Sequence, residues 1–163
     1  MSIFVVFSYA MTPVQAQNDK MYATIQKSDV KTLHSLLSNG GDVNQVNNLK
    51  NTILIMAAKI GDKSVIDCLL DHKADPNMQN KVGATALMIA AKYDNPHVVD
   101  MLLEHGADPL LQTNEGYKAS AFAYGYKHYE LHEKLVNAEK EAIKKAKKDR
   151  RKAKRAEKKA KKG

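Results

Sequence analysis

The sequence contains no tryptophan, a single cysteine and few aromatic residues, which make up 6% of its 163 residues. The lone cysteine, Cys68, excludes an internal disulfide framework and a metal site built from four cysteines. Because large rings are scarce, a hydrophobic core has to be built from Leu, Ile, Val, Ala and Met, which is typical of packed helices. The length and composition therefore predict an all-α protein with one domain of ordinary size.

The short motifs that accompany catalysis are also missing. The sequence has no Gly-rich phosphate loop and no Gly-x-Ser-x-Gly elbow. His128 and His132 are spaced to share one helix face, as metal ligands would be, but Glu130 lies one position too late for the His-Glu-x-x-His motif. No third ligand is obvious beside them. We therefore predict that the protein is not an enzyme and has neither a cofactor nor a metal site.

Positive charge is concentrated at the C-terminal end. The chain has 26 Lys or Arg and 18 Asp or Glu, and residues 138–163 hold 14 of the former and 4 of the latter. The rest of the chain, with 12 basic and 14 acidic residues, is slightly acidic. The basicity thus belongs to a tail and not to a folded surface.

The N-terminal residues have the pattern of an export signal. An apolar run over residues 3–11 is followed by Val14-Gln15-Ala16, with small residues where signal peptidase requires them. We therefore expect residues 1–16 to be a signal peptide, with a mature protein that begins at Gln17 and is periplasmic or secreted. No Lys or Arg precedes the run, so the alternative is an uncleaved apolar N-terminal strand or interfacial anchor in a cytoplasmic chain. The run is shorter than the roughly 20 apolar residues of a membrane span.

Two nearly identical stretches reveal an internal repeat. "TILIMAA" at residues 52–58 returns as "TALMIAA" at residues 85–91, which gives a period of 33. At the same period "TLHSLLSNGGDVN", "VIDCLLDHKADPN" and "VVDMLLEHGADPL" align without a gap. Leu54, Ala57 and Ala58 have the spacing of one helix face, as do their counterparts in the next unit. One helical hairpin cannot hide that much apolar surface, so the units are expected to stack.

The period of 33, the paired short helices and the Gly-Ala-Asp turn resemble the ankyrin repeat, over about residues 19–137. The resemblance implies an all-α solenoid of about four helix-turn-helix units in a domain of residues 17–137. The units are expected at residues 19–46, 47–79, 80–112 and 113–137, the first and last of them caps. Lys50 and Asp94 stand where the family has glycine, so we expect modest stability.

The resemblance also implies a protein-binding groove, formed by the turn tips and the exposed side of each first helix. Ile60, Tyr93 and Tyr126 follow one another at the repeat period and form an apolar or aromatic row, and Leu49 with Val82 forms a second. Exposed rows of this kind are candidate binding hot spots. For Tyr126, packing against the C-terminal helix is an equal alternative. The predicted partner-binding residues are Asn48, Leu49, Asn51, Lys59, Ile60, Lys81, Val82, Ala84, Lys92, Tyr93, Glu115, Tyr117 and Tyr126.

The tail, residues 138–163, lacks proline and is rich in alanine and lysine, so it is expected to be a solvated helix or a helix-prone disordered arm. Such a tail binds polyanions by releasing counterions. The predicted polyanion-binding residues are Lys144, Lys145, Lys147, Lys148, Arg150, Arg151, Lys152, Lys154, Arg155, Lys158, Lys159, Lys161 and Lys162.

The sequence therefore predicts a non-catalytic, monomeric scaffold or adaptor that binds a protein partner in its groove. If the chain is exported, its tail is expected to contact an anionic membrane or envelope surface. The alternative is a cytoplasmic or host-directed protein whose tail binds nucleic acid or serves as a nuclear localisation signal. A tail that only increases solubility is a third interpretation.

Overall fold

The structure, a computed structural model, describes residues 13–161. Over this range the chain forms helices and loops and no strand beyond an isolated bridge between Val46 and Thr52. The helices are, in chain order, α1 (Pro13–Gln26), α2 (Val30–Ser38), α3 (Ile53–Ile60), α4 (Lys63–Asp71), α5 (Ala86–Lys92), α6 (Pro96–Glu104), α7 (Ala119–Gly125) and α8 (Tyr129–Ala160).

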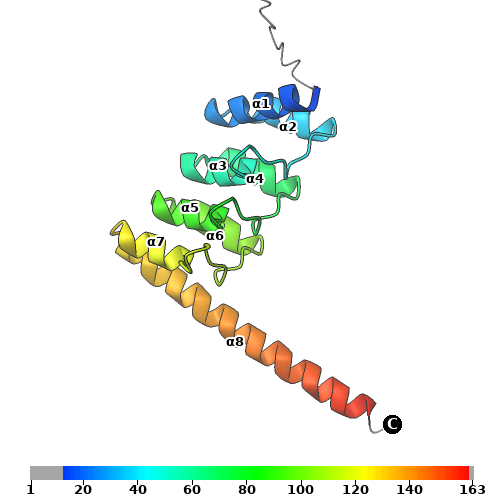
Figure 1. The fold of residues 1–163 in the computed structure, drawn as a ribbon, viewed down its shortest axis with the longest axis vertical. Coiled ribbons are helices and arrows are strands. Elements are labelled where there is room, and N and C mark those ends of the chain that lie inside the picture. The colour runs from blue at the N-terminus through cyan, green and yellow to red at the C-terminus, as the bar shows by residue number, and fades with distance from the viewer. Residues whose placement is uncertain (1–12, 162–163) are drawn as a thin grey trace, which may run out of the picture.

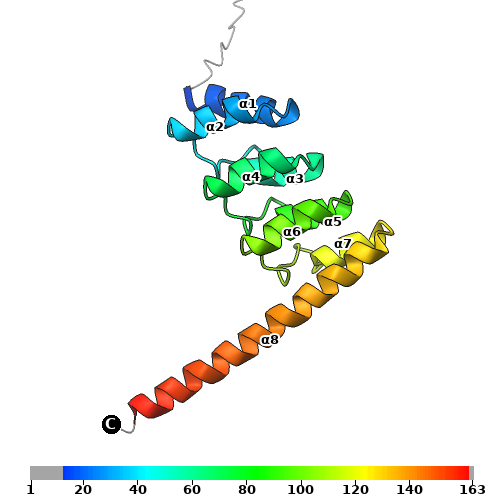
Figure 2. The same cartoon turned by 180° about the vertical axis from the view of Figure 1, so that it is seen from behind.

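The helices form four pairs that stack in chain order. The first helices of the pairs, α1, α3, α5 and α7, contact one another in succession and form one layer. The second helices α2, α4 and α6 contact one another in the same way and form a second layer. Figures 1 and 2 show the pairs one above another from opposite sides, with most of α8 extending away from the stack. The predicted all-α stack of helix-turn-helix units, followed by a C-terminal helix, is confirmed.

The core repeats with the sequence period. Leu54 in α3 and Leu87 in α5 are each 1% exposed, and the paired alanines that follow them, such as Ala57 and Ala58, are equally buried. Because alanine side chains are short, the first helices of neighbouring units can approach closely. Each of the helices α3 and α5 is preceded by a capping threonine whose hydroxyl oxygen accepts a backbone N–H three residues on, as Thr52 does from Ile55 at 3.1 Å.

The turns repeat with the same period. Positive φ angles recur at equivalent positions of successive units, and these positions are 28, 61, 94 and 127, then 40, 73 and 106, then 50, 83 and 116. Glycine adopts this conformation without a steric cost, whereas Lys50 (φ 57°) and Asp94 (φ 54°) adopt it as ordinary L-residues. At Gly61 a side chain would also displace the Asn95 side chain, because a Cβ there would lie 2.5 Å from Oδ1 of Asn95.

The N-terminal prediction falls mostly outside the described residues, since residues 1–12 are not among them. α1 begins at Pro13, so the bond after Ala16 that was predicted to be cleaved lies within this helix. No helix over residues 13–161 is long and apolar enough to cross a membrane. Export therefore stays a prediction.

The basic tail continues the second helix of the last unit. α8 runs from Tyr129 to Ala160 and passes the expected boundary between residues 137 and 138 without a break. Of the two forms expected for the tail, the structure has the helix. Because Glu139 still packs against α7, the part of α8 that belongs to the stack extends at least to this residue.

Candidate functional site

Three hairpin loops, here called the finger loops, lead into the helix pairs. They are residues 47–51, 80–84 and 113–117. In the first two, an asparagine at the start holds the turn. The side-chain oxygens of Asn47 and Asn80 each accept two backbone N–H groups of their own loop, at distances of 2.9 to 3.1 Å. The finger loops are therefore ordered by their own hydrogen bonds.

Neighbouring finger loops are also joined to each other. The N–H of Lys81 donates to the carbonyl of Leu49 at 3.0 Å, and the N–H of Asn114 donates to the carbonyl of Val82 at 3.1 Å. These bonds fix one finger loop relative to the next. The side chains of Leu49 and Val82 are 59% and 61% exposed, so the loops hold two apolar groups in the solvent at fixed positions.

A second row of apolar groups lies at the C-terminal ends of the first helices. Ile60 is the last residue of α3, Tyr93 follows α5 and Tyr126 follows α7. Their exposed fractions are 45%, 42% and 51%. The stack does not bury them, because at each site the helix ends and the chain turns back.

Two lysine side chains lie close to the aromatic rings of this row. Nζ of Lys59 is 5.4 Å from the centre of the Tyr93 ring, and Nζ of Lys92 is 5.7 Å from the same ring. The Lys92 ammonium is also 5.1 Å from the centre of the Tyr126 ring. Hydrogen bonding to the Tyr126 hydroxyl is the main cause that raises the pKa of Lys92, so this lysine remains charged. The row is thus aromatic and positively charged at once.

An apolar pocket of about 180 Å³ connects the finger loop and the helix end in the last unit. It is lined by Tyr117, Ala121, Phe122, Gly125 and Tyr126. Tyr117 comes from the finger loop, and Tyr126 from the end of α7, so two of the predicted partner-binding residues line the same pocket. Phe122 lies between them and was not predicted. Its counterparts one and two units earlier, Ile89 and Met56, are also partly buried, and their regular spacing was the signal that could have identified them.

A family model of ankyrin repeats, which spans three copies of the repeat, matches residues 20–113 and 65–149. The two matches together cover most of the sequence. The chain belongs to the ankyrin-repeat family. A comparison with curated protein sequences gave no significant match.

The ankyrin stack places nearly all of the predicted partner-binding residues at its surface. The exposed ones are Asn48, Leu49, Lys59, Ile60, Lys81, Val82, Tyr93, Glu115, Tyr117 and Tyr126. Asn51 and Lys92 are partly buried. Asn51 contributes to the stack, because its side-chain oxygen accepts from Nδ2 of Asn80 at 2.8 Å. The Tyr126 ring stacks on that of His128, with ring centres 6.5 Å apart, and the residue is 51% exposed, so its contact with a partner stays a prediction.

The prediction for Ala84 is wrong. Its side chain is 2% exposed, so it cannot touch a partner. The corresponding residue of the last finger loop, Tyr117, is 53% exposed. The physical reason is side-chain length, since a single methyl group stays within the folded loop whereas a phenol extends beyond it.

Two histidines at the ends of second helices bind backbone carbonyls. Nδ1 of His72 and Nδ1 of His105 lie 2.8 Å from the carbonyl oxygens of Cys68 and Met101, where the second helices end. They cap these helix ends. Cys68 itself is 7% exposed, and burial, followed by the charge of Asp71, raises the pKa of its thiol. It therefore lacks the low pKa of a reactive thiolate.

The two histidines that were considered as a metal pair bind different partners. Nε2 of His128 lies 3.1 Å from the carbonyl oxygen of Lys92, and Nδ1 of His132 lies 2.9 Å from that of Ser120. One histidine therefore attaches the start of α8 to α5, and the other attaches it to α7.

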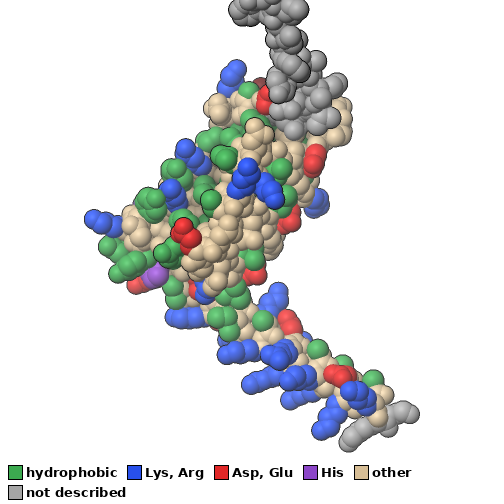
Figure 3. All heavy atoms as spheres, viewed as in Figure 1, with side chains coloured by type: hydrophobic (Ala, Val, Ile, Leu, Met, Phe, Trp, Pro, Cys, Tyr) green, Lys and Arg blue, Asp and Glu red, His purple; other side chains and the backbone are tan. Residues whose placement is uncertain are grey.

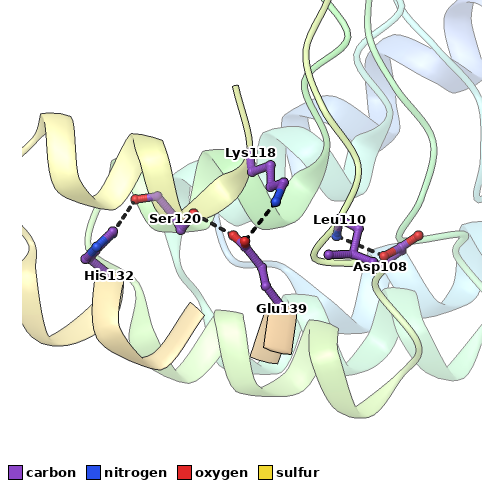
Figure 4. A network of polar contacts seen from close by, with 6 residues as sticks. All are labelled: Asp108, Leu110, Lys118, Ser120, His132 and Glu139. Carbon is purple, nitrogen blue, oxygen red and sulfur yellow. Dashed lines mark hydrogen bonds and ion pairs between the residues drawn. The ribbon is translucent and has the colours of Figure 1, made fainter. Parts of the chain in front are cut away.

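A buried polar cluster holds α8 against the last ankyrin unit (Figure 4). The Ser120 hydroxyl donates to Oε1 of Glu139 at 2.5 Å, and Nζ of Lys118 lies 3.0 Å from Oε2 of the same carboxylate. The Glu139 side chain is 13% exposed. Lys134 adds a bond to Asp100 of α6 at 2.6 Å. The sequence did not reveal this role of Ser120, because its partner lies in the segment assigned to the tail.

Beyond this cluster, α8 carries the predicted polyanion-binding residues into the solvent. Blue side chains follow the helix along its free length in Figure 3. All of the predicted cations whose side chains are described are exposed, while Lys159 and Lys162 fall outside the description. Seven basic residues share one helix face with Ile143, and these are Lys140, Lys144, Lys147, Lys148, Arg151, Lys152 and Arg155. The recurring spacing of three and four residues creates this continuous cationic face.

Proposed function

We propose that this ankyrin-repeat protein is a non-catalytic scaffold whose exposed rows, Leu49 with Val82 and Ile60 with Tyr93 and Tyr126, bind a protein partner. Ankyrin repeats are generally protein–protein interaction modules. The observation that carries the proposal is the exposure of apolar and aromatic side chains at repeat-related sites that the stack does not need for packing. Such groups commonly dominate the binding energy of an interface.

The chemistry of the surface indicates the kind of partner. Lys59, Lys81 and Lys92 lie among the exposed apolar residues. Their positive charges favour a partner segment with acidic side chains. The exposed rows and the pocket beside Phe122 favour apolar side chains on the same segment. We therefore expect a partner segment in which acidic and apolar residues alternate at short intervals.

Photo-crosslinking in the source organism tests this proposal. A photoreactive amino acid placed at Val82 or Tyr93 is expected to attach to one and the same protein. The control position is Asp67, which is exposed on α4 in the other helix layer. Equal crosslinking from Asp67, or no defined adduct from Val82 and Tyr93, would contradict the proposal.

A second function is supported by the free part of α8. We propose that its cationic face contacts an anionic membrane or envelope surface if the chain is exported, and nucleic acid if it is not. The full chain is expected to bind anionic vesicles tightly at low salt and weakly at high salt. A variant that ends at Ile143, which keeps Glu139 and the last ankyrin unit, should lose this binding. Retained binding without the tail would contradict the proposal.

The N-terminus of the mature protein decides between the two settings. A chain that begins at Gln17 supports export and an envelope surface. An intact Met1 supports the cytoplasmic alternative. In that case the full chain and the variant that ends at Ile143 should be compared for binding to duplex DNA.

A further inference from the structure

A cluster of three metal-ligating side chains lies where the first two ankyrin units meet in the second layer. His34 comes from α2, Cys68 from α4 and His72 from the end of α4. One ligand atom of each residue lies within 4.8 Å of the ligand atoms of the other two. The stack creates this arrangement, because His34 and Cys68 are far apart in the sequence.

Hydrogen bonds orient the two imidazoles toward one point. Nδ1 of His72 lies 2.8 Å from the carbonyl oxygen of Cys68, so the proton of the neutral ring lies on Nδ1 and Nε2 carries a free lone pair. Nε2 of His72 and Nε2 of His34 both approach the hydroxyl of Ser38, at 3.5 and 3.4 Å. A hydroxyl has one hydrogen and can donate to only one of them. A metal ion would accept electron pairs from both.

The surroundings suit a cation. The cluster lines an open pocket of about 470 Å³, which also contains the charged residues Asp67, Asp71 and Lys31. The two carboxylates outweigh the single ammonium, so the local charge is negative before the thiol ionises. The bond between the His72 ring and a backbone carbonyl is the contact that typically orients a histidine ligand.

We propose that His34, Cys68 and His72 bind one zinc ion, with a water molecule or the Ser38 hydroxyl as a fourth ligand. Nitrogen and sulfur ligands select zinc over magnesium or calcium. In a tetrahedral site such ligand atoms are about 3.3 to 3.6 Å apart. The ligand atoms lie within 4.8 Å of one another, and rotation of the exposed His34 side chain can bring them to this spacing. Binding converts the Cys68 thiol to a zinc thiolate and releases one proton to solvent.

The site would hold the first ankyrin unit to the second. Its ligands come from α2 and α4, so bound zinc adds a link between neighbouring units of the second layer. The next junction does not repeat the cluster, because the equivalent residues one period further on are Asp67, Met101 and His105. His105 makes the same carbonyl contact as His72, at the same 2.8 Å, without a thiol beside it. It is therefore a matched control.

Cobalt and zinc binding to the full-length, tag-free, reduced protein tests the proposal. One equivalent of Co²⁺ is expected to produce a near-ultraviolet thiolate-to-cobalt band, which Zn²⁺ removes. Cys68→Ser should abolish the band, and His34→Gln and His72→Gln should weaken zinc binding roughly tenfold or more. His105→Gln should leave the band and the affinity unchanged. Zinc should raise the melting temperature of the parent protein and of His105→Gln but not of Cys68→Ser.

Two results would overturn the proposal. The first is a parent protein without the cobalt–thiolate band. The second is a zinc affinity, or a zinc-dependent rise in melting temperature, that is the same for Cys68→Ser and for the His105→Gln control. Because His34 is exposed, its variant is expected to fold normally and keeps the test valid if His72→Gln is unstable.

Discussion

The ammonium group of Lys92 lies 5.1 Å from the centre of the Tyr126 ring, although the two residues belong to different ankyrin units. Lys92 ends the first helix of one unit and Tyr126 ends that of the next, so the contact follows directly from the stacking. It connects Tyr93 and Tyr126 within one exposed row, in which a cation separates two aromatic rings.

Tyr93→Ala should weaken partner binding at least about tenfold, because an exposed aromatic ring flanked by cations is a candidate hot spot. The melting temperature should hardly change, since surface substitutions usually alter the free energy of unfolding by less than about 0.5 kcal/mol. Titration calorimetry with the crosslinked partner, alongside thermal melting, measures both. Tyr129→Ala is the control, because Tyr129 is exposed but outside the rows. A parallel loss of affinity and stability would show that Tyr93 has a structural role instead.

The bond between Ser120 and Glu139 predicts an energetic coupling between α7 and α8. Hydrogen bonds to charged groups contribute about 1.5 to 3 kcal/mol, and this one is largely buried. A double-mutant cycle with Ser120→Ala and Glu139→Ala, measured by denaturant unfolding, should therefore give a coupling above about 1 kcal/mol. Glu141→Ala, which removes an exposed carboxylate on the same helix, should change stability by less than about 0.5 kcal/mol. Additive effects of Ser120→Ala and Glu139→Ala on the free energy of unfolding would contradict this coupling.

The positive φ angle of Lys73 predicts a stabilising glycine substitution. Lys73 has φ 64° at the repeat position where Gly40 and Gly106 stand. Because an L-residue adopts this conformation at a cost of about 1 to 2 kcal/mol, Lys73→Gly should raise the free energy of unfolding by about 1 kcal/mol. Gly106→Ala should lower it by a similar amount, since a Cβ there meets nothing within 4 Å and only the backbone is strained. Chemical denaturation measures the free energy of unfolding of both variants. Changes in the same direction would be inconsistent with this explanation.

The side chain of Gln45 predicts a second stabilising change. It is 7% exposed, and neither its amide nitrogen nor its oxygen has a hydrogen-bond partner within residues 13–161. Its counterparts in the next units are Met78 and Leu111. Gln45→Met should stabilise the fold by about 1 to 2 kcal/mol, because an unpaired buried amide is costly. Gln79→Met should do the opposite, as Nε2 of Gln79 donates to the carbonyls of Gly83 and Gln112. Thermal and denaturant unfolding should show a stability above that of the parent protein for Gln45→Met and below it for Gln79→Met.

The sequence predicted the parts of the molecule that depend on its period. The repeat register located the helices, their buried leucines and alanines, and the exposed row of Ile60, Tyr93 and Tyr126. These features follow because each unit meets its neighbours in the same way. Lys50 and Asp94, which replace glycine, were likewise located at turns with positive φ.

The features that the sequence did not predict depend on contacts outside the repeat pattern. Ser120 meets Glu139 because α8 continues past the last unit, which no repeat rule requires. His34 meets Cys68 because a histidine and a cysteine face each other at one junction and not at the next. Ala84 was assigned to the surface by analogy with its position in the loop, and the length of its own side chain decided otherwise.

Tyrosine footprinting of the partner complex tests the central claim most directly, because one chain contains both the site and its control. Tyr93, Tyr117 and Tyr126 lie on the proposed binding surface, whereas Tyr124 and Tyr129 are exposed and pack against each other with ring centres 6.0 Å apart. Hydroxyl-radical labelling of the free protein and of the complex is expected to show slower modification of the first three rings and unchanged modification of the last two. Unchanged labelling of Tyr93 and Tyr126 in a saturated complex would contradict the account.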